Sequence, residues 1–108
     1  MRVLISADET LHTTETVWME VLAGGRDAAH TTRLRRLLSR CEMIPIDGLS
    51  DHEDAASLYR TCRRAGETIR AINDCLIATV AIRADVDVLQ CDRDFEAVAR
   101  HSTLRLVT

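Results

Sequence analysis

The chain has 108 residues, of which 46% are hydrophobic and 29% are charged, and its net charge at pH 7 is -3. This length predicts one domain over residues 1–108 with a single core of ordinary size, and the composition excludes a disordered chain. The acidic balance gives no general attraction to nucleic acid, and no segment has the length of a membrane span. We therefore expect a cytoplasmic protein without a membrane partner.

The first half of the chain alternates short apolar runs with helical patterns. Residues 13–17 are rich in threonine and valine and predict a strand, followed by a helix over residues 18–23 that Gly24 ends. Leucines at spacings of three and four predict an amphipathic helix over residues 27–40. Residues 43–46 predict another short strand.

The second half continues the same alternation. Ser50, with Glu53 three residues later, matches a capping box and predicts a helix that stops near Gly66. A stripe of apolar residues predicts the next helix, and a strand, a short helix and a last strand follow, over residues 69–80, 86–89, 94–101 and 104–107. Such alternation predicts an α/β fold, a three-layer α/β/α domain with a central parallel sheet.

Three acids lie directly against apolar segments, namely Glu20, Asp74 and Asp92. A carboxylate beside a core costs solvation free energy unless a positive charge offsets it, and Mg²⁺ or Mn²⁺ prefers oxygen ligands. Asp92 follows a predicted strand at its carboxyl end, where sites form in parallel sheets. The competing interpretation is that these acids are surface groups of amphipathic elements, and for Asp94 that it caps a helix.

The ordered acidic motifs resemble those of the PIN-domain ribonucleases, in particular the VapC-type toxins of bacterial toxin-antitoxin modules. The second, third and fourth motifs of that family resemble the segments at residues 19–24, 68–78 and 92–95. The resemblance implies that Glu20, Asp74 and Asp92 bind Mg²⁺ or Mn²⁺ for hydrolysis of RNA phosphodiester bonds. Asp94 would be an additional metal ligand or a support.

The resemblance also implies partners. A VapB-type antitoxin would cover the acidic site, and the toxin would form a homodimer. Arg70, one helical turn before Asp74, is the candidate for a contact with a substrate phosphate.

The N-terminal segment of this chain departs from the first motif of that family. The family opens with an apolar strand that ends in a metal-binding aspartate, whereas this chain has Ser6 at that place, and Asp8 lies too close to Glu20 for a helix and a strand between them. We therefore expect residues 2–8 to be the tail of an internal helix in an N-terminally truncated domain that lacks the first strand, the first helix and the first acidic ligand.

This departure leaves two hypotheses open. The chain is an RNA-cleaving toxin whose activity the missing acid weakens, or it is a degenerate, non-catalytic PIN-like module that binds antitoxin or RNA without cutting. A nucleotide-binding regulator is disfavoured because the sequence has no glycine-rich phosphate loop.

Overall fold

The structure, a computed structural model, describes residues 3–5, 10–89 and 93–107. In chain order its elements are β1 (Val3–Ile5), β2 (Leu11–Thr13), α1 (Glu15–Ala23), α2 (Ala28–Leu38), β3 (Glu42–Met43), α3 (Gly48–Arg64), α4 (Ile72–Ala84), β4 (Asp87–Leu89), α5 (Arg93–Arg100) and β5 (Leu106–Val107). Among these residues no helix combines the length and the apolar character that a membrane crossing requires.

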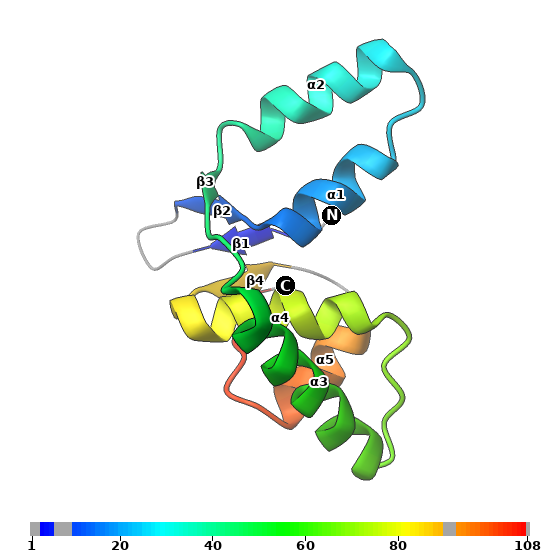
Figure 1. The fold of residues 1–108 in the computed structure, drawn as a ribbon, viewed down its shortest axis with the longest axis vertical. Coiled ribbons are helices and arrows are strands. Elements are labelled where there is room, and N and C mark those ends of the chain that lie inside the picture. The colour runs from blue at the N-terminus through cyan, green and yellow to red at the C-terminus, as the bar shows by residue number, and fades with distance from the viewer. Residues whose placement is uncertain (1–2, 6–9, 90–92, 108) are drawn as a thin grey trace.

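The strands form one five-stranded sheet in the order β3-β2-β1-β4-β5. In Figure 1 the strands lie between α1 and α2 above and α3, α4 and α5 below. The predicted α/β class is confirmed, and β2 pairs with β3 and β4 with β5 in parallel. One feature differs from the predicted parallel sheet, because the central strand β1 runs antiparallel to both of its neighbours.

The prediction that residues 2–8 are the tail of a helix is wrong for residues 3–5, which form β1. Val3 and Ile5 are β-branched and favour an extended chain. The strand pairs with β2 on one side and β4 on the other, so its backbone groups take part in two ladders. Ser6 and Asp8 lie outside the described residues.

Several element boundaries are set by caps that the sequence pattern only partly indicated. The amide of Trp18 donates to the carbonyl of Thr14 (2.9 Å), so α1 starts earlier than predicted and β2 ends at Thr13. The predicted start of α2 is confirmed, because the Asp27 side chain accepts from the amide of His30 (2.8 Å).

The predicted capping box at Ser50 is wrong, because α3 begins two residues earlier, at Gly48. Asp47 is the residue before the helix, and its amide donates to Oδ2 of Asp51 (2.7 Å). The carboxylate of Asp51 therefore accepts the hydrogen bond that the capping box assigned to Glu53. This bond caps the helix at Asp47 in place of Ser50.

Helix α4 is the centre of the core. Its residues 74–81 are all buried, and α3 and α5 pack against it. Side chains of the other elements complete this core, among them Val17, Cys62, Val88, Phe95 and Val98. A helix that is apolar on all faces is a buried helix, and Asp74 lies in its first turn.

A buried ion pair ties the start of α3 to the end of α4. The carboxylate of Asp51 is 1% exposed and accepts from Nε of Arg83 (3.0 Å) and from Nη2 (2.8 Å). The same Nη2 donates to the carbonyl of Pro45 (2.7 Å), in the connection from β3 to α3. Hydrogen bonds from Arg83 hold the pKa of Asp51 below its ordinary value of 3.8. Arg83 therefore links the end of α4 to the start of α3 and to the connection between β3 and α3.

This pair should make the free energy of unfolding depend on pH in the acid range. A carboxylate whose folded pKa is lowered contributes stability above its unfolded pKa, and the contribution is lost as the pH falls from about 5 through the folded pKa. Urea denaturation between pH 7 and pH 3 should show this decline, and the Arg83→Ala variant should show a shallower one. An equally steep decline in both proteins would contradict the assignment.

Candidate active site

Asp74 is a carboxylate inside the protein, at the start of α4. It is 1% exposed and lies in the first turn of that helix. The N-terminal end of a helix carries a partial positive charge, which favours an acid there. Its side chain is close enough to that of Asp94 to help lower the pKa of Asp94, so the structure brings two of the predicted site residues together.

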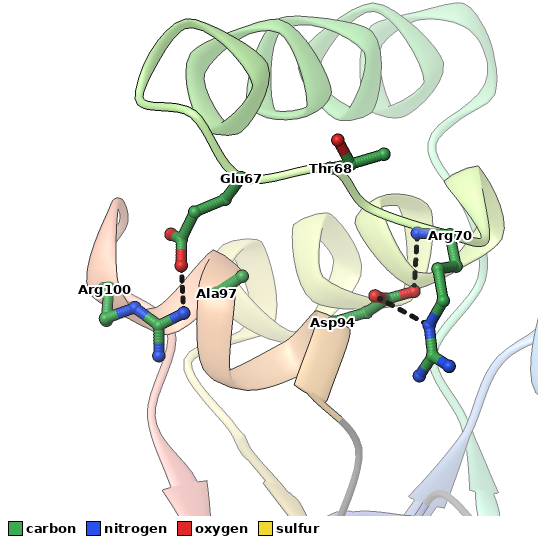
Figure 2. A pocket seen from close by; sticks show the side chains of 6 residues that line it. All are labelled: Glu67, Thr68, Arg70, Asp94, Ala97 and Arg100. Carbon is green, nitrogen blue, oxygen red and sulfur yellow. Dashed lines mark hydrogen bonds and ion pairs between the residues drawn. The ribbon is translucent and has the colours of Figure 1, made fainter.

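Asp94 supports the segment that leads into α4. Its Oδ2 accepts from the backbone amides of Arg70 (3.0 Å) and Ala71 (3.1 Å), and its Oδ1 lies 3.6 Å from Nε of Arg70 (Figure 2). Burial raises the pKa of Asp94, but the bonds from Arg70, Ala71 and Asp74 outweigh burial and leave the pKa below its ordinary value. Asp94 therefore supports the backbone before α4, and its predicted role as a metal ligand stays a prediction.

The Asp94→Ala variant should lose about 1–3 kcal/mol of unfolding free energy, because two amides at the start of α4 lose their acceptor. Asp94→Asn keeps one side-chain oxygen as an acceptor and should lose less. Urea denaturation of both variants at pH 7 measures the difference. Equal stability of the alanine and asparagine variants would show that the acceptor bonds contribute nothing.

The remaining acids of the predicted site are placed only in part. Glu20 lies on α1, which packs against α4, and its Oε1 is buried. Asp92 lies outside the described residues. Within residues 3–5, 10–89 and 93–107, no group of three or more His, Cys, Asp and Glu side chains is arranged to hold a metal ion. The structure therefore joins Asp74 to Asp94, and the predicted trio with Glu20 and Asp92 stays a prediction.

A cavity of about 300 Å³ opens beside Asp94 (Figure 2). It lies between α5 and the connection from α3 to α4, and its lining residues are Glu67, Thr68, Arg70, Asp94, Ala97 and Arg100. Arg70, the predicted substrate contact, is 69% exposed at its side chain and lines this cavity.

Sequence reasoning missed Glu67 and Arg100. Arg100 donates through Nη2 to Glu67, whose other carboxylate oxygen lies against Nε2 of His101. One signal was present in the sequence, because Asp94, Ala97 and Arg100 are three residues apart and share one face of a helix. The partner segment was not visible, since Glu67 lies more than thirty residues earlier in the chain.

Comparison with known proteins gives matches over most of the chain. The family described as PIN domain matches residues 1–101. The chain is 43% identical over 91 residues to VapC ribonuclease Mb1587 of Mycobacterium bovis, a match that covers 84% of this chain and 68% of that protein. Ribonuclease VapC11 of Mycobacterium tuberculosis matches with the same identity and the same two shares.

Proposed function

Because this chain belongs to the PIN-domain family and is related to the VapC ribonucleases, we propose that it is an endoribonuclease toxin that hydrolyses RNA phosphodiester bonds in the cytoplasm. The observation that carries the proposal is the buried carboxylate of Asp74, in contact with that of Asp94 at the start of the central helix. Two buried acids in contact cost solvation free energy unless a positive charge or hydrogen bonds offset them, and such groups cluster at functional sites.

The chemistry of these donors fits a hard divalent cation. When both are ionised, two carboxylates in contact repel each other, and a divalent cation beside them would relieve that repulsion. We assign Asp74, with Glu20 and Asp92, to hold Mg²⁺ or Mn²⁺, and Asp94 to support Asp74. When bound, the ion supplies an activated water and stabilises charge on the phosphate.

The side chains around the acids position the substrate. Asp94 fixes the backbone at Arg70 and Ala71, and so it fixes where α4 presents Asp74. Its contact with Nε of Arg70 orients that guanidinium at the edge of the cavity, where it would bind a phosphate of the RNA. Burial of residues 74–81 of α4 restricts the movement of the Asp74 side chain.

We further propose that a VapB-type antitoxin neutralises the toxin by covering the acidic site, and that the toxin acts as a homodimer. Both expectations come from the family. Size measurement of the chain, alone and mixed with its antitoxin, tests both, and a monomer that does not bind the antitoxin would contradict both.

Incubation of the chain with a labelled, structured RNA tests the catalytic proposal. Cleavage should require Mg²⁺ or Mn²⁺ and stop with EDTA, whereas cleavage that persists in EDTA would contradict a metal-dependent mechanism. The alternative is a degenerate, non-catalytic PIN-like module that binds antitoxin or RNA. It predicts no cleavage and no rise in melting temperature with millimolar Mn²⁺, because a ligand stabilises only the protein that binds it.

A further inference from the structure

The cavity beside Asp94 has two walls of different origin. One wall is a single face of α5, which presents Asp94, Ala97 and Arg100 at intervals of three residues. The other wall is the connection from α3 to α4, which carries Glu67, Thr68 and Arg70. At about 1.5 Å of rise per residue, Arg100 lies about 9 Å along the helix from Asp94. The cavity therefore extends from the candidate active site toward the C-terminal end of α5.

The acids of this cavity lie deeper than its arginines. Asp94 is buried and the side chain of Glu67 is 25% exposed, whereas the side chains of Arg100 and Arg70 are 56% and 69% exposed. Figure 2 shows Arg100 and Arg70 at opposite ends, with Ala97 and Asp94 between them. The two acids and two arginines balance in formal charge, but the arginines are the more exposed of the four side chains.

Glu67 holds the guanidinium of Arg100 in a defined place. The carboxylate accepts from Nη2 of Arg100 and also contacts Nε2 of His101, so it is fixed from two sides. A guanidinium has five N–H donors in a rigid fork, and Nη2 is the Arg100 nitrogen that donates to Glu67. The other nitrogens of the fork carry further donors. An arginine held in this way loses less side-chain entropy when it binds an oxyanion.

The lining favours a phosphate over a base. Arginine and threonine side chains are common ligands of nucleic-acid phosphates, and the cavity has Arg70, Arg100 and Thr68. Unspecific binding of single strands uses aromatic side chains on which bases stack, and none lies among the described residues that line this cavity.

We propose that this cavity is a subsite for an RNA phosphate next to the scissile bond, with Arg100 as the contact and Glu67 as the group that positions it. This subsite rests on the proposed function, because it presumes an RNA strand that passes Asp74 and continues along α5. It predicts that the charge of Arg100 contributes to RNA binding itself, whether or not a metal ion is present.

Binding of a fluorescein-labelled oligouridylate in EDTA, followed by anisotropy at several salt concentrations, tests the subsite without cleavage. Arg100→Gln should weaken binding by about threefold to tenfold and reduce the slope of log affinity against log salt by about 0.7, the value for one single-strand phosphate contact. The matched control is Arg33→Gln, which removes the same charge from an exposed position on α2 and should change affinity less than twofold. Equal losses in both variants would overturn the subsite.

Glu67→Gln separates a phosphate contact from a merely structural pair. Glutamine keeps a side-chain oxygen that can accept from Nη2 of Arg100, so the arginine stays positioned, and the substitution removes a negative charge near the bound phosphate. Affinity should therefore be unchanged or higher, whereas a merely structural ion pair would make Glu67→Gln as harmful as Arg100→Gln. Arg100→Lys should keep the salt slope of the original chain. If circular dichroism shows that Arg100→Gln does not fold, these two variants decide: weaker binding of Glu67→Gln or a lowered slope of Arg100→Lys overturns the proposal.

The outcome for the subsite can be distinguished from the outcome for the proposed function. Metal-dependent cleavage by the original chain, combined with normal RNA binding by Arg100→Gln, would overturn the subsite alone. Loss of binding in Arg100→Gln, in a chain that does not cleave RNA with Mn²⁺, would support the subsite and contradict the catalytic proposal.

Discussion

The Asp74→Asn variant is expected to lose RNA cleavage by about a thousandfold or more while it keeps its fold. Asparagine has nearly the shape of aspartate, and its amide can still donate a hydrogen bond to the Asp94 carboxylate. What it removes is the negative charge that a divalent cation needs at this place. Cleavage of a labelled RNA in Mn²⁺ measures the activity, and circular dichroism measures the fold.

A metal-binding role for Asp74 also predicts a thermal effect. Millimolar Mn²⁺ should raise the melting temperature of the original chain and should not raise that of Asp74→Asn. An ion that no longer binds the native state cannot stabilise it. Asp54→Asn on the exposed surface of α3 is the matched control and should keep both properties. An Asp74→Asn variant that cleaves RNA at the original rate would remove Asp74 from the mechanism.

The Arg83→Ala variant is expected to unfold with a free energy lower by about 2–3 kcal/mol. It leaves the buried carboxylate of Asp51 without its main partner, and it removes the donor to the carbonyl of Pro45. Breaking a buried ion pair from one side costs about 3–5 kcal/mol, and we expect a smaller loss because Arg83 is itself partly exposed to solvent. Urea denaturation at pH 7 gives the difference directly.

A second arginine provides the comparison for this variant. Arg105 makes ion pairs with Asp85 and Asp87, but Asp85 is well exposed, so solvent screens the interaction and Arg105→Ala should cost much less. The double variant Asp51→Asn, Arg83→Leu removes both charges and should recover part of the stability lost in Arg83→Ala. Equal losses in Arg83→Ala and Arg105→Ala would mean that burial of Asp51 has no energetic consequence.

Local patterns in the sequence located most of the helices. The leucine spacing predicted a helix over residues 27–40, and α2 covers Ala28–Leu38, with the side chain of Asp27 as its cap. Residues 94–101 were predicted as a helix and α5 covers Arg93–Arg100. At the start of α3 the prediction was wrong because a neighbouring residue competed for the same role, and Asp51 took the capping function predicted around Ser50. Caps and apolar periodicity act within a few residues, so a single sequence displays them.

The sequence predicted which acids are candidates for the site, but it did not predict the contacts that these acids make. Asp74 stood out because an acid in an apolar helix is costly, and its burial in the first turn of α4 agrees with that reasoning. The sequence left three roles open for Asp94, namely a helix cap, a metal ligand and a support. Its contacts with Arg70 and Ala71, more than twenty residues away, could be found only in the tertiary structure.

The sequence by itself determined the class of fold, the family resemblance and the presence of an acid, Asp74, within an apolar helix, because these depend on residue type, order and local spacing. The tertiary structure alone decided that β1 runs antiparallel in the middle of the sheet, that Arg83 fastens Asp51, and that Arg100 meets Glu67 beside Asp94. Strand direction and long-range side-chain pairs arise from how whole elements pack. That packing minimises exposed apolar surface over the entire chain, and no short segment of sequence contains it.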